Sequence, residues 1–359
     1  MSNPAAPSAL TLVDEDFRAG GPACRAPPTR FHLNLSERCQ LRCAHCITDA
    51  PARTRSGAAR EMPRPVLDAL RPHLEHACYV AFTHAGEPML APLFVPALEA
   101  LREARGGQPT VVHLLTNGMA LSEERFLDFA RLGVTSLSFS LDGMSEGSND
   151  LLRIGGRVSV LLPRIRAIAE LRAKEGLDVR LGIGWTLTRQ NAGELEDLLR
   201  FASDAGLDWV KLEEMFPQNP AAGEARLDAF EQEGLVARAQ ATAAALPVKL
   251  LDHTRSVEVW KCRLMLEKRM RRVSALDDLA NRTDINACRL PYEQVCVEPN
   301  GDVRPVTFHH PVAGNVLEQG LLDLWNGPVF AEVRREQRAR RLCGQGPATC
   351  PSDAGPGAW

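Results

Sequence analysis

The chain has 359 residues, of which 45% are hydrophobic and 24% are charged, so it can bury a large core and is not composed like a disordered or fibrous protein. Its length favours about two domains. The formal net charge of −3 gives no overall attraction to nucleic acid or to an anionic membrane, so we expect neither as a partner.

Residues 1–30 are rich in Pro, Ala and Gly and lack periodicity, so we expect a flexible lead-in. They show neither the basic start nor the apolar run of a secretion signal. No window of the chain has the roughly 18 uninterrupted apolar residues of a membrane span. We therefore expect a cytoplasmic protein, in which clustered cysteines are more often metal ligands or catalysts than disulfides.

Six apolar, strand-like runs then alternate with helical patterns. The strand-like runs are residues 30–35, 79–84, 110–118, 136–143, 178–188 and 208–214. The helical patterns are residues 92–105, a segment from Ser122 to Gly133, residues 161–176, and a segment from Asn191 to Gly206. Continuous apolar strands that alternate with helices predict a parallel sheet with covering helices. We therefore predict an α/β fold in which residues 31–219 form a partial (βα)6 barrel of the TIM type.

The remainder of the chain has a different sequence pattern. Residues 220–287 predict a charged, helical connecting region with one short apolar stretch at 248–251. From Cys288 onward, short strands, turns and cysteines follow one another. We therefore predict a second, small α+β domain over residues 288–359.

Three cysteines, Cys39, Cys43 and Cys46, form a C-x3-C-x2-C pattern directly after the first predicted strand. Three thiolates from one loop can hold three irons of a [4Fe-4S] cubane and leave the fourth iron open for a chelating substrate. A structural zinc site and chance are the alternatives, but zinc normally takes four ligands. His45 is a candidate fourth ligand, although its place between Ala44 and Cys46 would strain the loop.

This pattern resembles that of the radical S-adenosylmethionine (SAM) superfamily. The segment FTHAGEP resembles the family's G-G-E-P motif, which receives the SAM amino group. Gly86 and Glu87 fit that motif, whereas Ala85 replaces its first glycine. The segment LLTNG, which contains Asn117, resembles the end of the family's third strand. The resemblance thus implies that Gly86, Glu87 and Asn117 contact the cofactor.

Two later segments extend the resemblance. SFSLDG followed by NDLLRIGG resembles a family pattern in which Ser140 and Asp142 would line the SAM pocket. By the same match Arg153 would pair with the SAM carboxylate, which its forked guanidinium suits. WTLTRQN matches the fifth strand with its trailing asparagine and places Thr186 or Thr188 near the ribose.

The resemblance implies an enzyme that reductively cleaves SAM to a 5′-deoxyadenosyl radical, which then takes a hydrogen atom from the substrate. It also implies an electron donor such as ferredoxin or flavodoxin. Glu213 and Glu214 end the sixth predicted strand, where barrel enzymes place functional residues. They are candidates for holding a substrate amine, although either one can instead face solvent.

The C-terminal segment resembles the SPASM/twitch domain that many radical SAM enzymes carry. Cys288, Gly301, the run 314–316 and Trp325 fit its pattern, but Val306 stands where the second cysteine is expected. Candidate ligands for an auxiliary [4Fe-4S] cluster are Cys288, Cys343 and Cys350, with Cys296, His309 or His310 as a fourth. Three interpretations stay open: one auxiliary cluster with an unusual or open site, a domain without a cluster, or zinc.

The expected substrate is a peptide or a small natural-product precursor, which family members dehydrogenate, epimerise or cross-link. Cys262 and Cys296 are candidate hydrogen-atom donors, as in the family's epimerases, although an isolated cysteine is more often a small buried hydrophobe. Basic runs at 261–272 and 334–341 keep RNA modification open as an alternative. A non-enzymatic metal-binding module is the second alternative.

Overall fold

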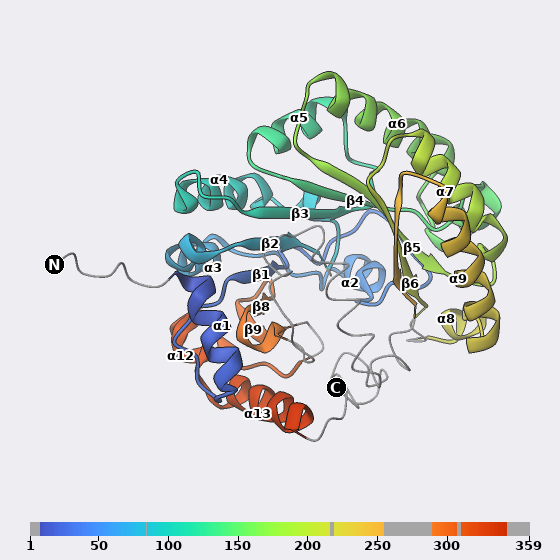
Figure 1. Ribbon diagram of the computed structural model, residues 1–359. Coiled ribbons are helices and arrows are strands. Elements are labelled where there is room, and N and C mark those ends of the chain that lie inside the picture. The colour runs from blue at the N-terminus through green and yellow to red at the C-terminus, as the bar shows by residue number, and fades with distance from the viewer. Residues whose placement is uncertain (1–7, 84, 216–218, 255–288, 307–309, 343–359) are drawn as a thin grey trace.

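A computed structural model describes residues 8–83, 85–215, 219–254, 289–306 and 310–342 (Figure 1). Within these residues, ten strands form one sheet in the order β10-β9-β8-β1-β2-β3-β4-β5-β6-β7. The strands are β1 (Arg30–Leu33), β2 (Tyr79–Phe82), β3 (Val111–Thr116), β4 (Ser136–Ser140), β5 (Arg180–Leu187), β6 (Trp209–Glu214), β7 (Lys249–His253), β8 (Gln294–Val297), β9 (Asp302–Pro305) and β10 (Gly314–Asn315).

The strands β1 to β7 are parallel neighbours, and β1 to β6 coincide with the six predicted strands. The predicted α/β fold with a partial barrel is therefore confirmed. The strand β7 adds a seventh parallel strand, at the short apolar stretch of the region that we predict to be a helical connection. Its five residues were too few to be assigned to the sheet without the contacts to β6.

Helices cover the outer face of the curved sheet (Figure 1). The described helices are α1 (Ala9–Ala19), α2 (Ala50–Ser56), α3 (Arg64–Leu70), α4 (Phe94–Arg105), α5 (Glu123–Arg131), α6 (Val158–Lys174), α7 (Leu195–Asp204), α8 (Pro220–Ala225), α9 (Ala229–Ala244), α12 (Leu321–Trp325) and α13 (Pro328–Leu342). In the described part of the chain, none of them is both long and apolar enough to cross a membrane.

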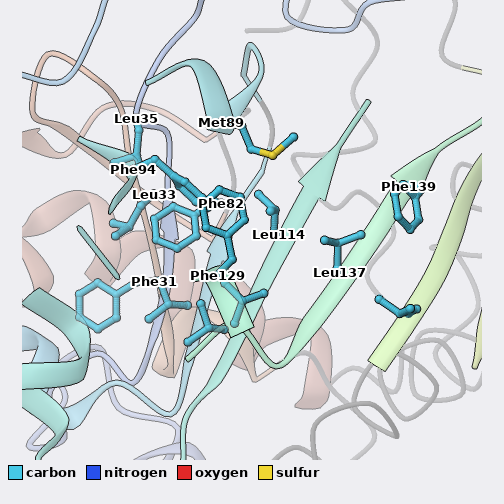
Figure 2. Close-up of a cluster of buried hydrophobic side chains, with 14 of the residues drawn as sticks. Phe31, Leu33, Leu35, Phe82, Met89, Phe94, Leu114, Phe129, Leu137 and Phe139 are labelled. Atoms are coloured by element: carbon cyan, nitrogen blue, oxygen red, sulfur yellow. The ribbon is translucent and has the colours of Figure 1, made fainter. Parts of the chain in front are cut away.

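Alternate residues of the strands pack against these helices and form the core (Figure 2). The ring of Phe94 on α4 lies edge-on to Phe82 of β2 and to Phe129 of α5, at centroid distances of 5.1 and 5.0 Å. On β4, Leu137 and Phe139 belong to the same buried cluster, while the serines that alternate with them face the other side of the sheet. This alternation fixes which side chains of each strand face the barrel interior.

The C-terminal strands continue the barrel sheet. β8 pairs parallel to β1, with His32 opposite Cys296, and β9 returns antiparallel to β8. Buried residues of β8 belong to the same hydrophobic cluster as those of β1. The described residues therefore show one continuous sheet on either side of the predicted domain boundary at residue 288.

Within the expected lead-in, residues Ala9–Ala19 form a helix. Ser8 accepts a hydrogen bond from the backbone of Thr11 and begins the helix α1, and Gly20 ends it with a φ of 64°. Phe17 is fully buried, and its ring lies edge-on to Tyr292 at a centroid distance of 5.5 Å. The composition of residues 1–30 does not indicate this helix, whose buried Phe17 packs against a residue from the far end of the chain.

Arg334 of α13 joins the two ends of the chain. It is fully buried, and it donates hydrogen bonds to the carbonyl oxygens of Pro291 at 2.9 Å and Pro22 at 3.0 Å. Its guanidinium lies 4.3 Å from the ring centroid of Trp325, and burial lowers its pKa. Since this arginine opens the basic run at 334–341, that run is not wholly a solvent-exposed patch.

We expect Arg334→Ala to destabilise the protein by about 2–4 kcal/mol, because two buried carbonyl groups lose their donor and the aromatic ring loses its cation. Urea unfolding of the purified protein measures this loss. Arg335→Ala is the matched control, since Arg335 is 54% exposed and pairs only with Glu332 within the described residues. Equal midpoints for the two variants would show that the buried arginine does not hold the termini together.

Candidate functional site

The cysteines Cys39, Cys43 and Cys46 lie on one loop that connects β1 to α2, which we call the cluster loop (residues 36–49). All three are partly exposed. The sulfur of Cys39 accepts hydrogen bonds from the backbone N–H of Leu41 at 3.4 Å and from the side-chain amide of Asn117 at 3.7 Å. The end of β3 therefore contacts the first of the three sulfurs directly.

The donor set fits an iron–sulfur cubane better than a zinc ion. Burial raises the pKa of the Cys39 thiol to about 12 and that of Cys43 to about 11, so both need a bound cation in order to ionise. Among the described residues, no three His, Cys, Asp or Glu side chains converge on a position for one metal ion. Zinc requires such convergence, whereas three thiolates of a cubane bind three different irons.

The segment that resembles G-G-E-P packs closely against the backbone of the cluster loop. Gly86 has a φ of 60°, and a Cβ there would lie 2.4 Å from the carbonyl oxygens of Ser36 and Arg38. Only glycine fits such a position. The backbone N–H of Glu87 donates to the carbonyl of Arg38 at 2.7 Å, which ties this segment to the residue before Cys39.

Glu87, a predicted cofactor contact, makes hydrogen bonds inside the protein. It is 1% exposed, and its carboxylate accepts hydrogen bonds from the hydroxyl of Thr116 at 2.8 Å and from the backbone of Asn117 at 2.9 Å. Burial raises its pKa to about 7. The carboxylate thus faces the protein, and it holds the residue whose amide contacts Cys39.

Asp142 is the centre of the site's hydrogen bonding. It is fully buried, and its Oδ1 accepts from the backbone of Thr186 at 2.6 Å. Its Oδ2 lies 2.6 Å from Nε of Arg153 and 3.0 Å from Nε2 of His45. Burial opposes ionisation, but the positive charge of Arg153 and the bonds from His45 and Thr186 lower the pKa of Asp142 to about 2.

Asp142, which we expect to line the SAM pocket, and Arg153, which we expect to pair with the SAM carboxylate, form an ion pair with each other. Their contacts with SAM stay predictions. His45 points its Nε2 at Asp142, and its Nδ1 is buried without a hydrogen-bond partner among the described residues. The histidine thus fastens the cluster loop to the end of β4.

A buried asparagine joins the ends of β4 and β5. The amide of Asn191 donates to the carbonyl oxygens of Asp142 at 3.0 Å and Thr186 at 2.8 Å, and its Oδ1 accepts from the backbone of Thr188. Thr188 is fully buried, whereas Thr186 and Ser140 are partly exposed at the strand ends. Of the two threonines proposed for the ribose, Thr186 has the accessible position.

The predicted substrate residues lie in ion pairs at the end of β6. Glu213 pairs with Lys211, and Glu214 pairs with Arg226. Both glutamates lie at the carboxyl edge of the sheet, on the same side as the cluster loop, because β6 is parallel to β1 through the intervening strands. Their contact with a substrate stays a prediction.

Cys296 of β8 is fully buried, and burial raises the pKa of its thiol to about 12. The side-chain amide of Asn34, directly after β1, donates to its sulfur at 3.8 Å. Val306 has a φ of 59°, which is unusual for a β-branched residue, and His310 is 2% exposed. The candidate residues Cys262, Cys288, His309, Cys343 and Cys350 lie outside the described residues.

Sequence reasoning found the three cysteines, Glu87, Asp142 and Arg153, but it did not find how they are connected. The positions of residues at the ends of neighbouring strands predict that their side chains lie near one another. They do not predict which charged groups form ion pairs. The role of His45 was missed because we considered it only as a metal ligand. Its place inside the C-x2-C spacing was the indication that it belongs to the site.

Comparisons with known proteins agree with this geometry. Residues 33–202 match the family model of the radical SAM superfamily, and residues 288–351 match the SPASM iron–sulfur cluster-binding domain. Mycofactocin maturase MftC from Mycobacterium ulcerans (strain Agy99) is 24% identical over 341 residues, which cover 92% of this chain and 83% of that protein. Pre-heme d1 synthase from Dinoroseobacter shibae is 26% identical over 343 residues, which cover 85% and 75%.

Solved structures share the fold. SuiB from Streptococcus suis superimposes with a TM-score of 0.64 at 16% identity, over 86% of this chain and 68% of that one. The structure of anSMEcpe with bound AdoMet gives a TM-score of 0.62 at 18% identity, over 87% and 81%. The chain belongs to the radical SAM superfamily, as an enzyme that uses a [4Fe-4S] cluster and SAM and carries a C-terminal SPASM domain.

Proposed function

We propose that this enzyme takes a hydrogen atom from a peptide, with a small natural-product precursor as the second candidate substrate. The observation that carries the proposal is the cluster loop, which presents three cysteine sulfurs while buried carboxylates brace it from two sides. When bound, the cluster and SAM supply one-electron cleavage of the SAM sulfonium and a 5′-deoxyadenosyl radical.

The chain's own residues position and enclose these groups. Cys39, Cys43 and Cys46 would hold the cluster. Glu87 fixes Asn117 against the sulfur of Cys39. The fully buried carboxylate of Asp142 pairs with His45 of the loop. A loop braced in this way keeps the cluster and the ends of β3, β4 and β5 in fixed relation, which is how such sites gain orientation.

Similarity to known enzymes favours a peptide. One of the relatives is a mycofactocin maturase, and SuiB has been solved bound to its precursor peptide SuiA. The name of pre-heme d1 synthase instead supports the small-molecule candidate. Dehydrogenation, epimerisation and cross-linking remain the proposed outcomes.

RNA modification stays the alternative that salt-dependent RNA retention would test. The non-enzymatic module is wrong, since the superfamily consists of enzymes.

The residues that the sequence predicts for substrate binding, hydrogen-atom donation and the auxiliary cluster remain proposals. Glu213 and Glu214 are proposed to bind a substrate amine by exchanging their present ion-pair partners. Cys296 and Cys262 are proposed hydrogen-atom donors, and the pKa of Cys296 supports a protonated thiol, which a donor needs. Cys288, Cys343 and Cys350 are proposed ligands of an auxiliary cluster. A ferredoxin or flavodoxin in the cytoplasm is the proposed electron source.

We expect Cys39→Ala to abolish formation of 5′-deoxyadenosine from SAM, because one of three cluster ligands is lost. Anaerobic reconstitution with iron and sulfide, followed by product analysis under dithionite, measures the effect. In the unaltered enzyme about four irons per chain indicate one cluster and about eight indicate two. Cys78→Ala is the control, since Cys78 is 9% exposed and lies away from the cluster loop. Full SAM cleavage by the Cys39 variant would refute the assignment of the loop.

We expect Asp142→Asn to lower the stability of the cluster-free protein by about 3–5 kcal/mol, since the variant leaves the buried charge of Arg153 unpaired. The same variant should incorporate less iron on reconstitution, because His45 loses its anchor. Urea unfolding and iron analysis measure the two effects. Asp128→Asn is the control, because Asp128 is 56% exposed. Unchanged stability and iron content would contradict the bracing role of Asp142.

A further inference from the structure

The helices α6 and α7 are neighbours on the outer face of the sheet, and a cleft of about 890 Å³ lies between them (Figure 1). The floor of this cleft is apolar. It is formed by Val158 and Leu162 of α6, Phe201 of α7 and Met144 from the loop after β4. Since all of these residues line one cavity, they form one continuous surface, which we call the helix cleft.

The rim of the helix cleft carries three carboxylates without a positive partner. Glu146, Glu170 and Asp204 line the cavity and are exposed. Within the described residues, none of their carboxylates forms an ion pair or a hydrogen bond. An apolar floor with this rim therefore offers negative charge to whatever binds there.

The two arginines of the helix cleft do not neutralise this charge, because both have other contacts. The guanidinium of Arg166 lies 5.0 Å from the ring centroid of Phe201, so it packs against the floor of the cleft. Arg200 pairs with Asp197 at 3.2 Å and with Glu196 at 3.2 Å on its own helix. The lining thus has more negative than positive groups, and its negative excess lies at the rim.

The helix cleft begins beside the site that contains the cluster loop. Both helices start at the carboxyl edge of the sheet, since α6 follows β4 and α7 follows β5. Met144 at this end of the cleft is two residues after Asp142, which limits the distance between their Cα atoms to about 7 Å. Glu194 fixes this end, because its carboxylate accepts hydrogen bonds from the N–H of Met144 at 2.8 Å and the hydroxyl of Ser145 at 2.7 Å.

The shape and charge of the helix cleft fit an amphipathic helix with basic residues. From Val158 to Glu170 the cleft follows α6 for about 18 Å, which is the length of roughly three helical turns. Apolar grooves of this kind bind the apolar face of a helix. The carboxylates of the rim favour Lys and Arg on the flanks of such a helix, because opposite charges across an interface select the partner.

We propose that the helix cleft binds a basic amphipathic helix within the peptide substrate, so that the adjoining segment of the same peptide enters the site at the end of β4. This inference rests on the proposed function, because it requires the substrate to be a peptide. The position of the cleft favours the substrate over a separate partner protein. A helix that lies along the cleft ends at Met144 and Glu146, only a few residues of extended chain from Asp142.

The test measures the binding of a synthetic helix to the holoenzyme. The probe is a fluorescein-labelled peptide of about 14 residues, with Leu at helical spacing on one face and Lys on the other. Fluorescence anisotropy under anaerobic conditions, without SAM, gives the dissociation constant. We expect Glu170→Lys combined with Asp204→Lys to weaken binding about 10-fold at low ionic strength, because the rim then repels the probe. Added salt should weaken the binding of the probe to the unaltered enzyme.

A matched control makes the same change of net charge elsewhere. Glu99→Lys with Glu318→Lys replaces two exposed carboxylates that do not line the helix cleft. The control should bind the probe as tightly as the unaltered enzyme. Equal dissociation constants for the cleft variant and the control would overturn the proposal. A peptide with the same composition but no apolar face should bind weakly, and equally tight binding of it would also overturn the proposal.

Photochemical cross-linking then tests whether the bound helix leads to the site. A photoreactive group is placed at each end of the probe in turn, and mass spectrometry identifies the cross-linked residues. We expect one end to react within residues 144–146 and the other end near Glu170 or Asp204. Cross-links that avoid residues 144–146 from both ends would show that the occupant does not lead to the site, which would point to a separate partner protein and refute the assignment to the substrate.

The outcome is separable from that of the proposed function. Probe binding is measured without SAM, so a preference of the helix cleft for the probe stands even if dithionite-reduced enzyme fails to form 5′-deoxyadenosine. Conversely, SAM cleavage under dithionite does not require an occupied cleft, so it survives if the cleft variant and the control bind the probe equally.

Discussion

A buried negative charge, the carboxylate of Asp142, organises the site. Removing it from water is costly, and the cost is offset because Arg153 and His45 pair with it and the backbone of Thr186 donates a hydrogen bond to it. These donors come from three separate parts of the chain. The cluster loop, the end of β5 and the segment after β4 therefore have one relative arrangement, and the position of the cysteines depends on it.

A second buried carboxylate, that of Glu87, holds the end of β3 against the cluster loop. The carboxylate of Glu87 accepts hydrogen bonds from the hydroxyl of Thr116 and the backbone N–H of Asn117. Gly86 beside it allows the chain to pass close to the cluster loop. The two acids differ in their surroundings. Positive charge keeps Asp142 ionised, whereas Glu87 has neutral donors and a raised pKa. The loop is thus fixed by one charged and one mostly polar contact.

The sequence predicted the parts whose cause is local. Six apolar runs located six strands, and the spacing of Cys39, Cys43 and Cys46 located the cluster loop. It did not predict α1, because the burial of Phe17 depends on Tyr292. It also did not predict that Arg153 pairs with Asp142, since the pairing depends on how two loops meet in space. Failures of this kind come from contacts between residues that are distant in the chain.

The pairing of β1 with β8 has a consequence for how the protein is made. Arg30 and Gln294 are 264 residues apart, so during synthesis the outer edge of β1 stays uncovered until almost the whole chain has left the ribosome. The first strand then offers unpaired backbone groups to other chains, which favours aggregation. A fragment that ends before β8 would leave this edge of β1 unpaired.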